Sequence, residues 1–207
     1  MAWGPGWALT ICRCFGKIGS GTRLVRRSVA GKMKPGVLTL FAAVLLLGSP
    51  QRLAAVEEIK PPFKLHWGET VDRMERLLTG AKLRIVDRRT VDGREVWDVE
   101  GIVQEGLRRT VFSFKNGELV EVEFQYHKPE WPESKYDAFM GDVRRRLEQL
   151  YGRGELIARK TEPVGDVTQT LVGYKWNQNN TAVELFYFSA QSASQVFRTL
   201  SVHYQTN

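Results

Sequence analysis

The stretch that decides the fold is "FKNGELVEVEFQY", residues 114–126. Its Asn116-Gly117 pair is the strongest short-range signal for a β-hairpin turn. After the turn, apolar side chains occupy every second position: Val120, Val122, Phe124 and Tyr126. The positions between them are polar: Glu121, Glu123 and Gln125. This alternation predicts an antiparallel strand with one face in a core and the other in water.

Similar patterns extend this hairpin in both directions along the chain. The strands predicted in this half are residues 82–90, 95–103, 107–115 and 118–126. A short helix is predicted before them, over residues 70–79, because Val71, Met74, Leu77 and Leu78 share one helical face. Thr70 is placed to cap this helix, and Asp72 lies in its first turn, where the helix dipole favours an acid.

The same plan then repeats. Ser134 is predicted to cap a second helix, with Asp137 three residues later in a variant of the capping box, and Gly152 is predicted to end it. Four more strands are predicted, at residues 155–161, 167–176, 182–188 and 195–204. Trp97 and Trp176 lie 79 positions apart near corresponding strand ends, which indicates an internal repeat.

The predicted fold class is α+β, with two tandem units that each combine a helix with a four-stranded antiparallel sheet. The two quasi-repeats, residues 63–126 and 134–205, form one mature domain over residues 56–207. Both helices are expected on one side of the sheet, because neither an amphipathic helix nor a one-sided sheet buries its apolar face alone. The connection between the halves is short, so we expect a continuous or closely abutted sheet.

The N-terminal 55 residues are predicted to be a leader segment. Lys34 is followed by the apolar run Val37 to Leu47, and Leu53-Ala54-Ala55 places a small residue at a cleavage site, which is typical of a signal peptide. The run is too short for a permanent membrane anchor. Met33 is the predicted initiator; a long basic n-region and an organelle transit peptide are the two alternatives. We therefore expect a periplasmic or secreted product, cleaved near Ala55.

The charge of the chain follows from this leader. The formal net charge is +7, but eight of the 30 basic residues and none of the 23 acidic residues precede Val56, which leaves 22 basic against 23 acidic residues afterwards. Without a surplus of basic residues, nucleic acid is not an expected partner. The two cysteines, Cys12 and Cys14, lie in the leader, so the mature part has neither a thiol nor a disulfide.

A resemblance appears in "LHWGETVDRMERLL", residues 65–78. An aromatic-glycine turn before a short amphipathic helix and an antiparallel sheet resembles the opening of the small lipoprotein of the outer-membrane β-barrel assembly machine. The tandem plan is similar to that of the β-lactamase inhibitor protein family. The resemblance implies binding to other proteins rather than chemistry. This chain lacks the lipid-bearing cysteine of the first and the disulfides of the second, so no functional residue is carried over.

No pattern predicts a catalytic, metal or cofactor site. His66, His127 and His203 have no second ligand three or four residues away, unlike the histidines of a zinc helix. Glu121 and Glu123 point the same way from one strand, but we expect both in the same solvent, without the contrast in pKa that acid and base catalysts need. No serine lies in a recognised nucleophile motif. We expect a protein that is not an enzyme.

The connector "HKPEWPESKY", residues 127–136, carries the candidate partner-binding residues Trp131 and Tyr136. Pro129 and Pro132 stiffen it and hold Trp131 between them. Trp131 either packs into the seam between the halves or stands out as a binding anchor, since tryptophan is enriched both in cores and in interface hot spots.

Three classes of function follow. The first is an exported noncatalytic protein that binds another protein in the cell envelope or outside the cell. The second is a periplasmic carrier of a small molecule or lipid, with a pocket lined by Tyr174, Trp176, Phe186, Tyr187 and Phe188. The third is an envelope hydrolase. The oligomeric state and the identity of the partner are left open.

Overall fold

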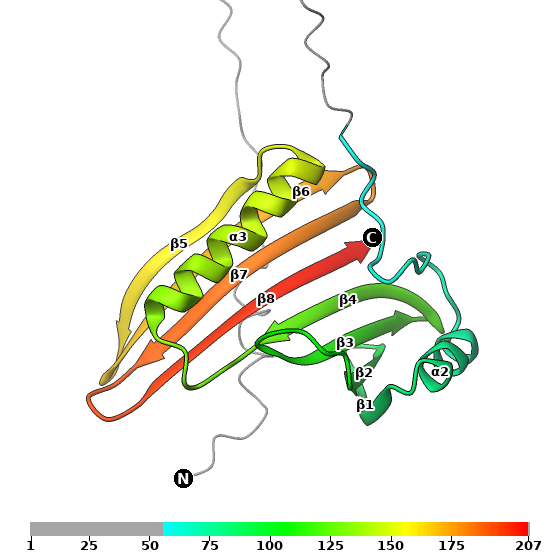
Figure 1. Cartoon of the computed structure of the whole chain (residues 1–207), viewed down its shortest axis with the longest axis horizontal. Coiled ribbons are helices and arrows are strands. Elements are labelled where there is room, and N and C mark those ends of the chain that lie inside the picture. The colour runs from blue at the N-terminus through cyan, green and yellow to red at the C-terminus, as the bar shows by residue number, and fades with distance from the viewer. Residues whose placement is uncertain (1–55, 207) are drawn as a thin grey trace, which may run out of the picture. The chain divides into compact units, whose positions relative to one another are not determined.

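The computed structural model describes residues 56–206, which form one eight-stranded antiparallel sheet and two helices (Figure 1). The leader prediction, with its start at Met33 and cleavage near Ala55, lies outside the described residues. In chain order the elements are α2 (Val71–Gly80), β1 (Arg84–Val91), β2 (Arg94–Glu100), β3 (Leu107–Lys115), β4 (Glu118–Tyr126), α3 (Glu133–Tyr151), β5 (Glu155–Val164), β6 (Val167–Gln178), β7 (Thr181–Gln191) and β8 (Val196–Thr206).

The predicted division into two units, each with its own four-stranded sheet, is wrong. The strands follow the order β1-β2-β3-β4-β8-β7-β6-β5 in a single sheet. Strands β4 and β8 join the halves, with pairs that run from Glu121 opposite Gln205 to Tyr126 opposite Leu200. This pairing is favourable because β4 and β8 would otherwise each expose an unpaired strand edge.

The hairpin turns follow the sequence signals. Asn116 and Gly117 have φ values of 53° and 78°, so both residues of the β3–β4 turn adopt the left-handed conformation expected of a two-residue hairpin. Asp92 and Gly93, with φ of 50° and 76°, make the same kind of turn between β1 and β2. The predicted Asn-Gly hairpin is confirmed.

The two helices begin differently. Thr70 caps α2 as predicted, and its hydroxyl oxygen accepts a hydrogen bond from the amide of Arg73 at 3.4 Å. The cap predicted at Ser134 is wrong: α3 begins after Pro132, whose carbonyl oxygen accepts from the amides of Lys135 and Tyr136. Pro132 suits this place because proline has no amide hydrogen that the first turn would leave unpaired. Gly152, with φ of 79°, ends α3 as predicted.

Helix α3 lies across β5 to β8, and α2 lies beside β1 to β4 (Figure 1). One apolar cluster takes side chains from both helices, including Met74 and Leu78 of α2 and Met140 and Leu147 of α3. Leu77, expected in the core, is instead 44% exposed, so the apolar stripe of α2 is narrower than predicted. Among the described residues, no helix combines the length and the apolar composition that spanning a membrane requires.

Replacing Leu147 by alanine should lower the free energy of unfolding by about 2 to 5 kcal/mol, since truncation of a buried leucine removes apolar burial and leaves a cavity. Leu147 is 4% exposed and packs into the cluster under α3. Leu150, on the same helix and 37% exposed, is the matched control, and Leu150→Ala should cost much less. Urea unfolding of the three proteins measures both changes. Equal losses would contradict the packing of α3.

Candidate functional site

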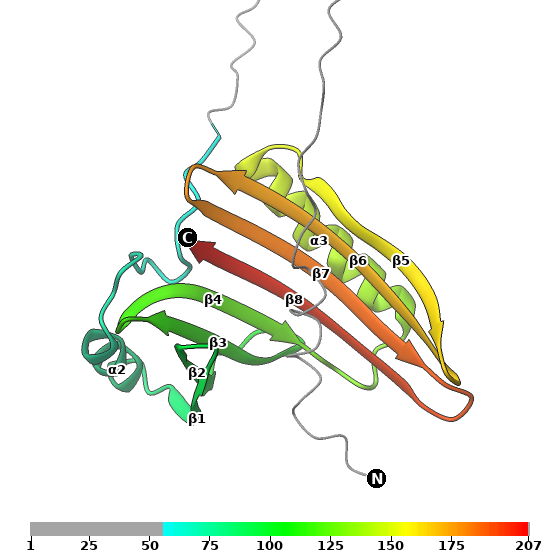
Figure 2. The same ribbon diagram turned by 180° about the vertical axis from the view of Figure 1, so that it is seen from behind.

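The sheet face opposite the helices is the candidate site, and Figure 2 shows it from behind the view of Figure 1. We call it the open face, because no helix among residues 56–206 lies on it (Figure 2). It is formed by alternate residues of the central strands: Glu121, Glu123 and Gln125 of β4, Thr199, Ser201, His203 and Gln205 of β8, and Glu184, Phe186 and Phe188 of β7. The open face therefore combines charged and aromatic side chains.

At its centre His203 lies between two carboxylates. The Nδ1 atom of His203 is 3.0 Å from Oε1 of Glu121, and its Nε2 atom is 3.5 Å from Oε1 of Glu123. Nε2 is also 3.0 Å from Oγ of Ser201, and Arg94 binds Glu121 from β2 at 3.3 Å. We name these five residues the His203 cluster. The side chains of His203, Glu121 and Glu123 are only 17 to 19% exposed, so the two glutamates do not share the open solvent that we expected for them.

The ionisation of the cluster follows from these contacts. Burial alone would lower the pKa of His203, but the charges of Glu123 and Glu121 and the hydrogen bond to Glu121 outweigh it and raise that pKa to about 9. For Glu121, burial raises the pKa, yet the hydrogen bond to His203 and the charges of His203 and Arg94 lower it overall. His203 is therefore an imidazolium and Glu121 a carboxylate at neutral pH.

Ser201, His203 and Glu121 stand in the order of nucleophile, base and orienting acid that serine hydrolases use. A base must be neutral to accept the serine proton, and an imidazole with a pKa near 9 is almost wholly protonated at pH 7. Glu123 also lies near the same Nε2 atom that would take the proton. The cluster is accordingly suited to hold charge in place rather than to move a proton.

Aromatic side chains lie beside the cluster on the same face. Phe197 stacks on His127 with ring centroids 4.9 Å apart, and its ring lies 6.4 Å from that of Phe188. Phe186, two residues before Phe188 on β7, makes an edge contact with His203 at 5.9 Å. We name His127, Phe188 and Phe197 the aromatic end. Phe197 is 44% exposed, so it offers apolar surface to a partner.

The charged residues around the cluster are paired within the chain. Glu184 binds Lys175 at 2.7 Å and Gln205 at 3.2 Å. Asp98 is 2% exposed and lies 2.5 Å from Arg109 and 3.0 Å from Arg89. These pairs hold the polar side chains of the open face in a fixed arrangement.

The predicted binding residues Trp131 and Tyr136 lie elsewhere, in the core on the other side of the sheet. Trp131 is 7% exposed and packs against Tyr136 and Phe139, with both ring separations at 5.4 Å. Tyr136 is 1% exposed, and its hydroxyl contacts the backbone of Lys128 and Arg198. Trp131 therefore packs the connector against α3. A binding role for Trp131 and Tyr136 stays a prediction.

The aromatic residues predicted to line a carrier pocket do not gather around one space. Tyr174, Trp176 and Tyr187 belong to the core, with exposures of 8, 3 and 4%. Phe186 and Phe188 alternate with Tyr187 along β7 and so lie on the open face. Residues of a single strand that point to opposite faces cannot line one pocket, which disfavours the carrier.

The three histidines have different partners. His66 is bound by Glu69 at 3.3 Å, and His127 by the carbonyl oxygen of Arg198 at 2.7 Å. Within residues 56–206, no group of three or more histidine, cysteine or acidic side chains is placed to hold a metal ion. Comparison of the chain with protein-family models, curated proteins and solved structures finds no match.

Proposed function

We propose that this chain is an exported, noncatalytic protein that binds another protein through its open face. The observation that carries the proposal is that the exposed ring of Phe197, in the aromatic end, lies on the same face as the fixed charges of the His203 cluster. Protein interfaces commonly combine an apolar anchor with a polar surround that supplies orientation and specificity. Phe197 is the proposed anchor, and the His203 cluster is the proposed surround.

The open face suits a large partner better than a small ligand. Strands β4, β8 and β7 present its residues side by side, so the face extends over several strands. Because the cluster charges are already paired, they do not have to be reorganised when a partner arrives, and such preorganisation lowers the cost of binding.

Export is proposed from the signal-like segment before Val56 and from the absence of cysteine after it. A noncatalytic role is proposed because His203 is protonated at neutral pH and so cannot activate Ser201. The resemblance of residues 65–78 to envelope proteins that act by binding points in the same direction.

Phe197→Ala should weaken partner binding at least tenfold, which corresponds to about 1.4 kcal/mol, because it removes the exposed anchor of the aromatic end. The partner is first captured from envelope and extracellular extracts with the immobilised wild-type chain, and its Kd is then measured for each variant. Phe63→Ala is the matched control, because Phe63 is 50% exposed and contacts Phe124 on the helix-bearing face. If Phe63→Ala abolishes binding and Phe197→Ala does not, the open face is not the interface.

A further inference from the structure

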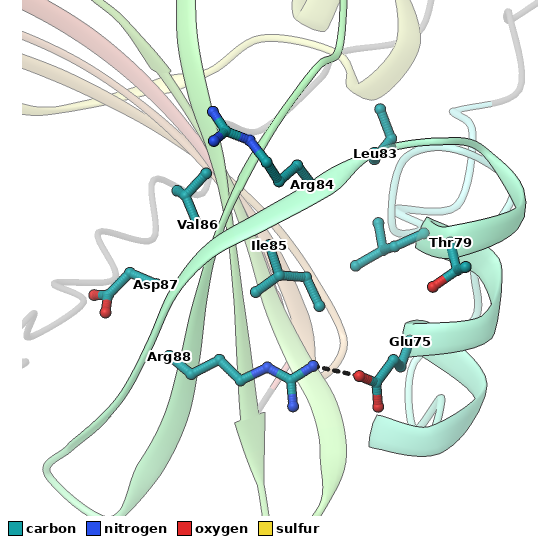
Figure 3. A pocket seen from close by; sticks show the side chains of 9 residues that line it. Glu75, Thr79, Leu83, Arg84, Ile85, Val86, Asp87 and Arg88 are labelled. Carbon is teal, nitrogen blue, oxygen red and sulfur yellow. Dashed lines mark hydrogen bonds and ion pairs between the residues drawn. The ribbon is translucent and has the colours of Figure 1, made fainter.

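A groove separates helix α2 from the edge strand β1 (Figure 3). None of the residues that line it belongs to the open face. Its volume is about 520 Å³, within the range of ligand-binding sites. The consecutive residues Leu83 to Arg88 line one wall, and Glu75, Leu78 and Thr79 line the other. The groove therefore follows the strand rather than crossing it.

Strand β1, which forms one wall of the groove, has an edge without a strand partner among the described residues. β1 is the first strand of the sheet and, within the described part of the chain, pairs only with β2. The amide and carbonyl groups on its other edge have no strand partner, and such an edge is a template for another extended chain. A groove bounded by an edge strand on one side and a helix on the other is the geometry in which peptides are bound by strand addition.

The lining defines the side chains that would fit. The apolar residues of the lining are Leu78, Leu83, Ile85 and Val86. Figure 3 shows the Ile85 side chain directed toward α2. The charged residues of the lining are already paired: Arg88 with Glu75 of the opposite wall at 2.6 Å, Arg84 with Glu100 at 2.7 Å, and Asp87 with Arg89 at 2.7 Å. A basic or acidic peptide would therefore find no free opposite charge there, whereas an apolar side chain would gain burial.

We propose that this groove binds an extended, uncharged and apolar peptide segment of another protein, which adds to the free edge of β1 as a further strand. Backbone hydrogen bonds to β1 hold the segment, and alternate apolar side chains enter the groove against Leu83 and Ile85. The surface is separate from the open face, so it stands whether or not the proposed function is correct.

A second copy of this chain is a poorer occupant. The pairing of β1 with β2 shifts between Ile85 and Asp87, and such a bulge twists an edge away from flat pairing with an identical strand. A short peptide does not have to pair along the whole length of β1, so it avoids this problem.

The test uses the full chain, labelled with ¹⁵N, and a short capped peptide in which serine and valine alternate. Titration should move the amide signals of Leu83 to Arg88 and of Glu75 to Thr79. Two further peptides carry N-methyl groups on one or the other set of alternate amides. Since alternate amides of a strand point to opposite edges, one methylated peptide should lose binding at least tenfold and the other should keep it. Equal effects of the two would overturn the proposal.

Thr79→Arg supplies the matched protein variant, because Thr79 is exposed at the groove rim and the longer side chain would fill the groove. It should weaken peptide binding at least tenfold, while Thr168→Arg, at an exposed position of β6, should leave it unchanged. No shift of the groove signals at a peptide concentration of about 1 mM, or undiminished binding to Thr79→Arg, would overturn the proposal. Loss of open-face binding in Phe197→Ala would leave this result unaffected.

Discussion

Trp131→Ala should lower the free energy of unfolding by about 3 to 5 kcal/mol, the range found when a buried tryptophan is truncated. The side chain is 7% exposed and is enclosed by Tyr136 and Phe139 on one side and by Gly106 on the other. Its removal would take away the ring contacts that Trp131 makes with Tyr136 and Phe139 of α3. Guanidinium unfolding of the full chain measures the loss.

Gly106 lies against the ring of Trp131. Its φ is 75°, and a Cβ atom built there would lie 2.5 Å from Cη2 of Trp131, closer than atoms approach in folded proteins. Gly106→Ala alone should therefore destabilise the chain. In the Trp131→Ala background the ring is gone, so the added methyl should cost less than it does in the wild type. A double-mutant cycle measures this coupling, and strictly additive losses would contradict the contact.

Alanine substitution should affect mainly stability at Trp131 and mainly partner binding at Phe197. Phe197→Ala should change the free energy of unfolding far less than Trp131→Ala, because its ring is 44% exposed. If Trp131→Ala leaves stability within about 0.5 kcal/mol of the wild type, as surface changes do, Trp131 lies outside the core and the binding role predicted for it gains support.

The strands of this sheet could largely be predicted because their signals are local. Strands β3 and β4 begin and end where the alternation and the Asn116-Gly117 turn placed them. β2 is shorter than predicted: it ends at Glu100, because Gly101 has a φ of 108° that interrupts the extended backbone. The predicted α and β elements and the antiparallel sheet are confirmed.

The short connection predicts that the two halves share or abut one sheet, and they do share one. The strands that join them could not be predicted from local signals. Nothing local to residues 118–126 distinguishes a strand at the edge of a four-stranded sheet from one that pairs on both sides, because its apolar alternation is the same in both cases. The partner of β4 is β8, whose paired residues Leu200 to Gln205 lie roughly eighty positions away. Pairing over such a separation depends on the whole topology rather than on turn signals.

The candidate site depends on that same pairing. Glu121 and Glu123 alternate with apolar residues as solvent-facing carboxylates do, and His203 has the pattern of an isolated surface histidine. Register between β4 and β8 places Glu123 directly opposite His203, and this is what buries the charges together. The alternation therefore places Glu121 and Glu123 on the face away from the core, as observed, but it does not predict their ion pairs with His203.

His203→Gln should lower the free energy of unfolding at pH 6 by about 3 kcal/mol, because breaking a largely buried ion pair leaves the partner carboxylates uncompensated. Glu121 and Glu123 would then face each other across a neutral side chain, with Arg94 bound to Glu121 alone. His66→Gln is the matched control: the His66 side chain is 80% exposed, and its loss should change stability by less than about 0.5 kcal/mol.

The pH dependence of stability gives the second measure of this cluster. The pKa of His203 is raised from 6.5 to about 9 on folding, so the folded state binds the proton more tightly than the unfolded state. The stabilisation from this group is complete below pH 6.5 and is lost as the pH rises towards 9, at up to about 1.4 kcal/mol per pH unit. Unfolding free energies measured from pH 6 to pH 9.5 should therefore fall in the wild type.

The same measurement on His203→Gln separates the histidine from every other group that titrates in this range. With no imidazole, the variant should lose stability more gently than the wild type between pH 6.5 and 9, and the two curves should converge near pH 9. His66→Gln should keep the wild-type slope. Parallel curves for the wild type and His203→Gln would show that His203 is not held as an imidazolium. The objection to Ser201 as a nucleophile would then fall, since a neutral His203 beside Glu121 could accept its proton.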